Sequence, residues 1–230
     1  MTGVQTCALP ISRLIGGAVA VVSGRAIEAL DLFLHPWRFP SAGIHGLQMR
    51  LRHDAETGMP AVATVLETHA AALRLFAQTH RGVLLEDKGL ALALHCRQRP
   101  ELEDAALALV EALAASVPGV LVAQRGKCVA ELRMAGSDKG KAVLQLMQEP
   151  DFAGRRPVFF GDDLTDEPAF AVVRAMGGIG VFIGIPTDFT NATASLHAPA
   201  SVRSLIALLA GRAQGDGPSD GETRKAFACP

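Results

Sequence analysis

The sequence predicts an α/β protein with a parallel-sheet core and an inserted second domain. Two stretches in which short apolar strands alternate with helices, 18–34 and 139–209, flank a middle region of meandering strands and two helices. Alternation of strand and helix is typical of a parallel sheet, whereas consecutive strands favour a separate antiparallel layer. With 230 residues, of which 49% are hydrophobic, the chain is long enough to bury such a core.

The expected elements follow from hydrophobic periodicity. The first stretch predicts a strand over 18–22 and a helix over 26–34. The middle region predicts a helix over 60–79, two strands within 83–97, a helix over 101–115 and an alternating strand over 127–133. The second stretch predicts helices over 139–148, 166–176 and 202–209, with strands over 157–160 and 179–183. Residues 13–48 and 134–212 are therefore assigned to the core, and 49–133 to the inserted domain.

Both ends of the chain differ from this pattern. The segment MTGVQTCALPI follows neither a strand nor a helix period and is similar to the translation of a sequencing adapter, so residues 1–12 are interpreted as non-native. Glycine, aspartate, serine and proline dominate 213–230, which predicts a disordered tail.

The charge pattern excludes several classes of partner. The formal net charge is −1, and no block of lysine and arginine suggests binding to nucleic acid or to an anionic membrane. No apolar run approaches the ~20 residues that span a bilayer. The four cysteines form neither a CxxC pair nor a zinc-ligand pattern, which favours free thiols and a cytoplasmic location.

The most unusual stretch is VFFGDDLTDEPAF, at 158–170, which contains Asp162, Asp163, Asp166 and Glu167 and no basic residue. Like charges at this spacing repel by about 1 kcal/mol per pair even in water. A helix N-terminus accounts for Asp166 and Glu167. Asp162 and Asp163 follow the strand directly and are better explained as part of a Mg²⁺ site, because this ion is bound by one or two carboxylates together with substrate phosphate.

A second signal is GSDKGKAV, in which Ser137 is the expected N-cap of a helix and Lys139 lies in its first turn. A cation is unfavourable at that end of a helix, and Gly140 weakens the helix further. Both features are explained if the turn approaches an anion closely. By the same capping argument, Thr165 is expected to cap the helix that follows the acidic stretch.

A third signal is Ser23-Gly24-Arg25, at the end of the first strand. A hydroxyl and backbone N–H groups at this position can hold a phosphate oxygen. Capping of the next helix by Ser23 is an equally good explanation, and the tripeptide does not decide between the two. Ligands of open α/β sheets lie beyond the carboxyl ends of the strands, where Ser23 and Asp162 are both expected.

Together with AVAVVSGRAIEALDLFL, FPSAGIHGLQMR, LEDKGLALALHCR and QRGKCVAELRMAGSDKGKAV, these signals resemble the trehalose-6-phosphate phosphatases of the haloacid dehalogenase superfamily, over Ala18–Leu209. The resemblance implies a haloacid dehalogenase-like parallel-sheet (Rossmannoid) core with an inserted α+β cap domain. It also implies Mg²⁺-dependent hydrolysis of trehalose 6-phosphate through an aspartyl-phosphate. A synthase of trehalose 6-phosphate is the implied partner, either separate or fused.

The resemblance also implies roles for individual residues. It assigns catalytic roles to Lys139, Asp163 and Asp166, metal binding to Asp162, and phosphate binding to Ser23, Gly24 and Arg25. Sugar recognition by the cap is expected from Lys88, Lys127 and Glu131, together with Glu86 and Arg133. His45, in GIHG, is either a substrate-binding residue or a core histidine, and both interpretations remain open.

One departure from the family pattern concerns the nucleophile, which the family carries in a D-x-D-G-T motif on the first core strand. No two aspartates of this sequence are separated by a single residue. We therefore expect the first core strand with the nucleophile to be missing and the chain as it stands to be inactive. A related sugar phosphatase of the same superfamily and a non-catalytic sugar-phosphate-binding module are the alternatives.

Overall fold

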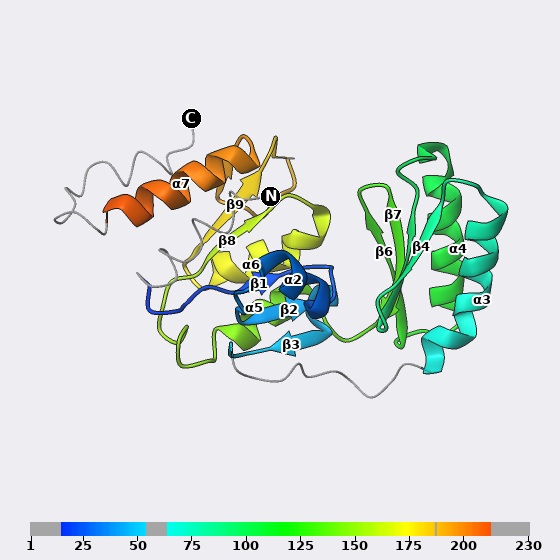
Figure 1. The fold of residues 1–230 in the computed structure, drawn as a ribbon, viewed down its shortest axis with the longest axis horizontal. Coiled ribbons are helices and arrows are strands. Elements are labelled where there is room, and N and C mark those ends of the chain that lie inside the picture. The colour runs from blue at the N-terminus through cyan, green and yellow to red at the C-terminus, as the bar shows by residue number, and fades with distance from the viewer. Residues whose placement is uncertain (1–14, 54–63, 187, 213–230) are drawn as a thin grey trace.

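The computed structural model describes residues 15–53, 64–186 and 188–212, and it consists of two lobes (Figure 1). Residues 1–12 and 213–230, for which a non-native segment and a disordered tail were predicted, lie outside the described residues. One lobe, the core, contains segments from both ends of the described chain. The other lobe, the cap, is made by the middle of the chain.

Within the described residues, the core contains two three-stranded sheets and four α-helices. In the first sheet, β1 (Val21–Val22) pairs in parallel with β2 (Ser41–Gly43), which pairs antiparallel with β3 (Gln48–Arg50). In the second, β8 (Val158–Gly161), β9 (Ile179–Ile183) and β10 (Ala194–Leu196) are all parallel. The core helices are α2 (Ile27–Leu34), α5 (Lys139–Leu146), α6 (Glu167–Ala175) and α7 (Pro199–Arg212).

One layer of helices connects the two core sheets. Val143 of α5 and Val173 of α6 form the centre of a small apolar cluster. Val22 of β1 packs on this cluster from the first sheet, and Phe159 of β8 packs on it from the second. Among the described residues, β1 and β8 each pair with a strand on one side only. The two sheets therefore share the α5–α6 layer, and each leaves one strand edge unpaired.

The cap is an antiparallel sheet of strand order β4-β5-β7-β6 with two helices on one face. Figure 1 shows α3 and α4 on the face of this sheet that is turned away from the core. The cap strands are β4 (Leu84–Asp87), β5 (Ala91–His95), β6 (Leu121–Gly126) and β7 (Val129–Met134), and the cap helices are α3 (Thr64–Thr79) and α4 (Glu103–Ala115).

Alternation along the cap strands separates an apolar face from a polar one. Leu92, Leu94 and Leu132 are buried in the cluster beneath the helices. Glu131 and Arg133 alternate with Leu132 on β7 and therefore lie on the opposite, helix-free face. This polar face is turned toward the core.

Apolar packing joins the cap to the core at their junction. Ile44 and Leu47, from the loop between β2 and β3, belong to the same buried cluster as the cap residues Leu90 and Met134. The first core segment extends to Arg50, since β3 pairs with β2. No described helix has the length and apolar character needed to cross a membrane.

Most predicted elements are confirmed, with shifted ends. The first strand is shorter than 18–22, and the helix expected over 101–115 begins at Glu103 because a 3-10 helix occupies Pro100–Leu102. The strand expected over 127–133 begins at Val129, since the two preceding residues form the turn from β6. β2, β3, β6 and β10 were not predicted. These short segments show little periodicity, and they become strands by pairing with their neighbours: β2 with β1 and β3, β6 with β7, and β10 with β9.

Candidate active site

The acidic stretch is folded around Asp166. The carboxylate of Asp166 accepts hydrogen bonds from the backbone N–H groups of Asp162 (3.0 Å) and Asp163 (3.1 Å) and is 3% exposed. Gly161 is required for this arrangement, because a Cβ at that position would lie 2.5 Å from Cγ of Asp166. Asp166 therefore shapes the turn after β8.

Lys139 supplies the positive charge that balances Asp166. Its ammonium nitrogen lies 2.6 Å from Oδ1 of Asp166, and both side chains are at least nine-tenths buried. A buried ion pair of this kind is stable because each charge compensates the other where water is excluded. Lys139 begins α5 and Asp166 precedes α6, so the pair also links the two helices.

The structure gives Gly140 a packing role that the sequence did not predict. A Cβ on Gly140 would lie 2.6 Å from the carbonyl oxygen of Pro168, in the first turn of α6. The glycine therefore allows α5 and α6 to pack closely. Because Lys139 is adjacent, this packing also brings its ammonium group to Asp166.

The capping residues also differ from the expectation. Asp138, and not Ser137, caps α5, since its carboxylate accepts a hydrogen bond from N–H of Lys141 at 2.9 Å. Asp163, and not Thr165, caps the 3-10 helix Leu164–Asp166. In both cases a nearby carboxylate, one residue away for Asp138 and two for Asp163, takes the position, because its negative charge is favoured at a helix N-terminus.

Glu167 has a different task from its acidic neighbours. One of its carboxylate oxygens accepts a hydrogen bond from the Thr190 hydroxyl at 2.7 Å, and the other accepts from the backbone N–H of Asn191 at 2.7 Å. Glu167 thus holds the loop between β9 and β10 against the start of α6. The carboxylate of Asp162 is exposed and makes no hydrogen bond or ion pair in the described part of the chain.

The loop after β1 is fitted to His45. Oγ of Ser23 accepts a hydrogen bond from N–H of Arg25 at 3.1 Å, and N–H of His45 donates to the carbonyl of Ser23 at 2.9 Å. A Cβ on Gly24 would lie 2.6 Å from Nε2 of His45, so the imidazole occupies the space beside this glycine. The hydroxyl of Ser23 stabilises its own turn and does not cap α2, whose first N–H group, at Ile27, donates to Oε1 of Gln48 at 2.8 Å.

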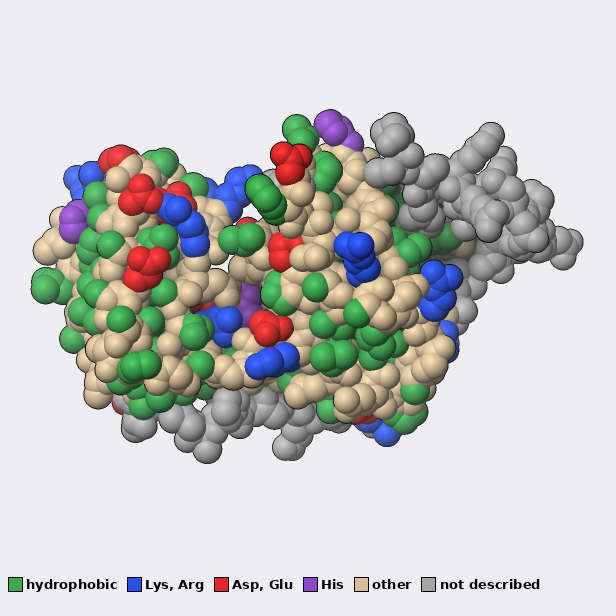
Figure 2. All heavy atoms as spheres, turned by 180° about the vertical axis from the view of Figure 1, so that it is seen from behind, with side chains coloured by type: hydrophobic (Ala, Val, Ile, Leu, Met, Phe, Trp, Pro, Cys, Tyr) green, Lys and Arg blue, Asp and Glu red, His purple; other side chains and the backbone are tan. Residues whose placement is uncertain are grey.

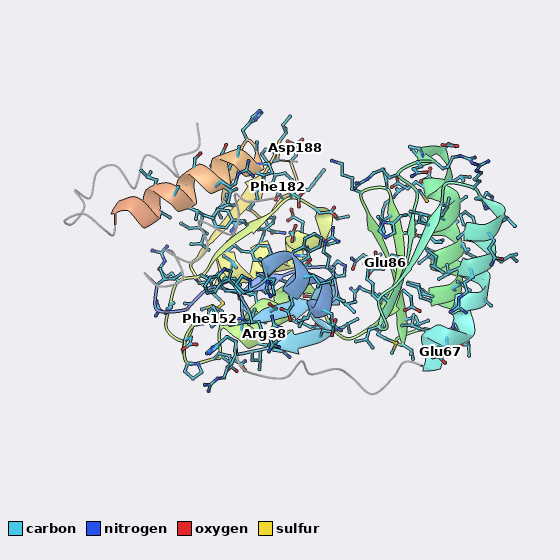
Figure 3. All side chains as sticks on the ribbon, in the orientation of Figure 1. Arg38, Glu67, Glu86, Phe152, Phe182 and Asp188 are labelled. Atoms are coloured by element: carbon cyan, nitrogen blue, oxygen red, sulfur yellow. The ribbon has the colours of Figure 1, made fainter. Side chains whose placement is uncertain are left out.

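On the cap, Lys88 and Glu131 form a buried pair. The ammonium of Lys88 lies 2.8 Å from Oε2 of Glu131, and both side chains are at least nine-tenths buried. Burial acts to raise the pKa of Glu131, but His45 and Lys88 outweigh it, so the pKa lies below its ordinary value. Glu86 lies on the cap face that is turned toward the core (Figure 3). Its carboxylate oxygen Oε2 is 2.7 Å from Nε2 of His95.

Gln124 and Arg133 connect the cap to the core. Nε of Arg133 donates to Oε1 of Gln124 at 2.8 Å, and its NH1 donates to the carbonyl of Ser137 at 2.8 Å, just before α5. Nε2 of Gln124 lies 3.0 Å from Nε2 of His45, which in turn lies 3.6 Å from Oε1 of Glu131. These contacts join β6 and β7 of the cap to two loops of the core.

A cavity of about 290 Å³ lies between the two lobes. Figure 2 shows a hollow between them with basic, acidic and histidine side chains inside it. The cavity is lined from the core by His45, Asp138, Lys139, Leu164, Thr165 and Pro168, and from the cap by Ala123, Gln124, Arg125 and Arg133. It therefore combines Lys139 of α5 with Arg133 of the cap sheet, whereas the guanidinium of Arg125 pairs with Glu103 and Asp104 of α4.

The cap also reaches the acidic turn. A Cβ built on Gly126, at the end of β6, would lie 3.7 Å from Oδ2 of Asp163. Lys127, which is exposed, follows Gly126 in the two-residue turn between β6 and β7. This turn therefore places a cationic residue of the cap close to the carboxylates of the core.

The acidic turn contains the type of ligand, carboxylate oxygen, that a magnesium ion prefers. Asp162 offers an exposed carboxylate without another partner, whereas Asp163 caps a helix and Asp166 pairs with Lys139. No group of three or more histidine, cysteine, aspartate or glutamate side chains that could hold a metal ion is found among the described residues. A single protein carboxylate, with water and substrate phosphate as the other ligands, is compatible with the way magnesium is usually bound.

The structure therefore brings most of the sequence-predicted residues to the facing surfaces of the two lobes. Gln124 was missed, because glutamine in a short strand carries no local signal of function. His95, the partner of Glu86, was missed for the same reason. Only the strand register identifies Gln124: it pairs with Glu131 across β6 and β7 and therefore lies on the same face of the sheet.

Comparison with known proteins finds sequence similarity over most of the chain. The sequence model of the trehalose-phosphatase family matches residues 14–200. The chain is 39% identical to trehalose-6-phosphate phosphatase of Escherichia coli (strain K12) over 193 residues, which cover 84% of this chain and 71% of that protein. It is 38% identical to a probable trehalose-phosphate phosphatase of Sinorhizobium fredii over 201 residues, which cover 87% of this chain and 75% of that protein.

Solved structures agree on the fold. The C-terminal domain of trehalose-6-phosphate phosphatase from C. albicans superposes with a TM-score of 0.74 at 22% identity, covering 89% of this chain and 84% of that one. A haloacid dehalogenase-like hydrolase from B. subtilis superposes with a TM-score of 0.61 at 11% identity, covering 91% of this chain and 93% of that one. The predicted haloacid dehalogenase-like fold is therefore confirmed. With the family match over residues 14–200 and these sequence identities, the chain belongs to the trehalose-phosphatase family of phosphoric monoester hydrolases.

Proposed function

We propose that the protein hydrolyses trehalose 6-phosphate to trehalose and phosphate in a magnesium-dependent reaction. The observation that carries this proposal is the cavity between the lobes, which is lined by Lys139 of the core and Arg133 of the cap. Two cationic side chains at one cavity suit a phosphate monoester, which carries close to two negative charges near neutral pH. The proteins of Escherichia coli and Sinorhizobium fredii that are named for this reaction are relatives at 38–39% identity.

Each lobe has a separate task in the proposed reaction. On the core, Lys139 offsets the negative charge of the phosphate, and the loop Ser23-Gly24-Arg25 offers a hydroxyl and backbone N–H groups to its oxygens. Asp162 would hold the magnesium ion, which supplies Lewis-acid stabilisation of the phosphoryl oxygens when bound. Asp166 keeps Lys139 in position and shapes the turn that presents Asp162.

The cap is proposed to recognise the sugar. Oε1 of Glu131 is buried and has no hydrogen-bond partner among the described residues. A buried carboxylate oxygen without a partner is costly, and a sugar hydroxyl can donate the missing hydrogen bond. Lys88, which holds the other oxygen of Glu131, and Lys127, at the tip of the cap, supply further donors.

The nucleophile of the proposed aspartyl-phosphate is not among the residues of this sequence, which has no D-x-D pair. Its strand would lie between β1 and β8. The support for this position is that both strands have an unpaired edge and pack on the same α5–α6 layer. Without a nucleophile the chain is proposed to be inactive, since the uncatalysed hydrolysis of a phosphate monoester is extremely slow.

The test is an assay of phosphate release from trehalose 6-phosphate with two proteins. One is the chain itself, and the other carries an additional N-terminal strand with a D-x-D-G-T motif. We expect release only from the second protein and only with magnesium present, with loss of activity on chelation. Release by the first protein would contradict the proposed inactivity, and release that is unaffected by chelation would contradict the role of Asp162.

A non-catalytic sugar-phosphate-binding module is the second candidate, and the lack of a D-x-D pair is the observation that favours it. Binding of trehalose 6-phosphate without turnover by the strand-restored protein would support this candidate. A related sugar phosphatase is distinguished by the variants Lys127→Ala and Glu131→Ala. Both should impair hydrolysis of trehalose 6-phosphate more than that of other sugar phosphates. The cytoplasmic location and the synthase partner remain predictions.

A further inference from the structure

Two cysteines lie opposite each other at one end of the cap sheet. The register of β5 and β7 ends with the pair His95–Val129, and the next step along both strands brings Cys96 opposite Cys128. The N–H group of Cys96 donates to the carbonyl of Cys128 at 2.9 Å, which extends the ladder by this pair. In a hydrogen-bonded antiparallel pair the two Cα atoms are about 5.5 Å apart, and a disulfide joins Cα atoms that are about 4.4–6.8 Å apart. The backbone therefore places the two cysteines within the reach of a disulfide bond.

The side chains of this pair belong to the apolar side of the cap sheet. Two steps back along the ladder, the pair Leu94–Ala130 is buried in the apolar cluster beneath α3 and α4, and Cys96 belongs to the same cluster. Cys128 continues the alternation of β7, although it lies in the turn and has a φ of 57°. The pKa of the Cys96 thiol is raised, by burial most of all and then by Glu103 and Cys128. The last of these effects indicates that the two thiols are neighbours.

The two thiols differ in their access to solvent. Both are free, and Cys96 is 0% exposed, whereas Cys128 is partly exposed in the turn between β6 and β7. The thiolate is the reactive form of cysteine, and the raised pKa of Cys96 favours its protonated form. Cys128 is therefore the thiol that a dissolved oxidant meets first, and Cys96 lies behind it.

From this arrangement we propose that Cys96 and Cys128 are a redox modification site, which closes to a reversible disulfide with a low-molecular-weight disulfide such as oxidised glutathione as the oxidant. The Cys128 thiolate attacks one sulfur of the oxidant, which forms a mixed disulfide and releases one glutathione thiolate. Cys96 then loses its proton and attacks the Cys128 sulfur, which releases the second glutathione. The two cysteines together lose two electrons and two protons, and the two glutathione thiols that form take up both.

The disulfide ties the end of β5 to the turn that carries Lys127. Lys127 directly precedes Cys128, and a Cβ on the neighbouring Gly126 would lie 3.7 Å from Oδ2 of Asp163. Oxidation therefore restricts a turn of the cap that lies close to the acidic stretch of the core, and reduction releases this restriction. The proposal concerns the structure of the cap and does not depend on which substrate is hydrolysed.

Peptide mapping of the full chain tests the pairing. The chain is incubated with oxidised glutathione, unfolded, alkylated at its remaining thiols and digested with trypsin in the absence of reductant. We expect peptides 89–97 and 128–133, which contain Cys96 and Cys128, to be joined by a disulfide and to separate on treatment with dithiothreitol. Glutathione adducts that do not convert to this bond, or bonds only to the other two cysteines of the sequence, would overturn the proposal.

Thermal unfolding tests whether the bond constrains the folded chain. Oxidation should raise the Tm by about 5 °C or more, because the bond restricts the unfolded chain over the loop that it closes. Cys128→Ser, at the partly exposed position, and Cys96→Ala should each abolish the rise. The double variant Cys7→Ser with Cys229→Ser, at positions outside the described residues, keeps both proposed partners and should show the full rise. An oxidised chain with an unchanged Tm, or a rise that persists in Cys128→Ser, would contradict a bond between Cys96 and Cys128.

Discussion

Nζ of Lys139 and Oδ1 of Asp166 lie 2.6 Å apart in a place from which water is nearly excluded. The residues are 27 positions apart in the sequence, and the second oxygen of Asp166 closes the turn after β8. The charge that makes the acidic stretch tolerable therefore comes from the N-terminus of the neighbouring helix. The ion pair therefore joins the helix start that contains Lys139 to the acidic stretch that contains Asp166, which the sequence showed as two separate signals.

Asp166→Asn should lower the free energy of unfolding by about 3–5 kcal/mol, because it leaves the Lys139 ammonium buried without a counter-charge. Urea denaturation followed by circular dichroism measures the change. In the double variant Asp166→Asn with Lys139→Met, the loss should be smaller than the sum of the two single losses. Asp151→Asn, at an exposed position, is the control and should change stability by less than about 0.5 kcal/mol. Additive effects of the two single changes would contradict a direct ion pair.

Gly140→Ala should destabilise the protein by about 1–3 kcal/mol, although alanine is the better helix former by about 1 kcal/mol. The reason is the 2.6 Å distance between the new Cβ and the carbonyl oxygen of Pro168, which forces α5 and α6 apart. Thermal unfolding gives the comparison, with Gly126→Ala as the control because its nearest neighbour would be 3.7 Å away. A stabilised Gly140→Ala would show that the helices have room between them.

The ionised carboxylate of Glu131 should stabilise the fold in a pH-dependent way. The pKa of Glu131 in the folded protein is below its ordinary value of 4.5, since His45 and Lys88 outweigh the effect of burial. The charge therefore contributes stability at pH values above 4.5, and this contribution is lost as the pH falls through the lowered pKa.

Urea denaturation of the unmodified chain and of Glu131→Gln over a range of pH provides the measurement for Glu131. The difference in unfolding free energy should be constant above pH 4.5 and change in favour of the variant as the pH falls further. Glu111→Gln, on the exposed face of α4, should follow the unmodified chain at every pH. A difference that does not depend on pH would contradict the lowered pKa of Glu131.

Asp31→Ala should cost about 3–5 kcal/mol of stability, because Arg50 is left buried without its partner. The guanidinium of Arg50 is 0% exposed and donates two hydrogen bonds of 2.7 Å to the Asp31 carboxylate and one of 3.0 Å to the carbonyl of Phe39. The matched change Glu28→Ala removes an exposed acid from the same helix and should cost about 1 kcal/mol or less. Equal effects of the two changes in urea denaturation would show that burial of Arg50 does not depend on Asp31.

The amino-acid sequence by itself determined the helices and most of the longer strands, the division into core and inserted cap, and the two charged signals at Lys139 and the acidic turn. These properties depend on short-range periodicity and on residue types that are rarely grouped without a reason, so they can be recognised along the chain. The quoted motifs determined the family for the same reason.

Only the tertiary structure decided what each residue contacts. It showed that Gly140 and Gly161 are needed for close packing, that Asp138 and Asp163 are the caps, and that Gln124 faces His45 from a position 79 residues away. Such contacts depend on how the cap sheet lies against the core loops. Local sequence patterns carry no information about that distance or orientation, because the free energy that fixes them comes from packing between elements far apart in the chain.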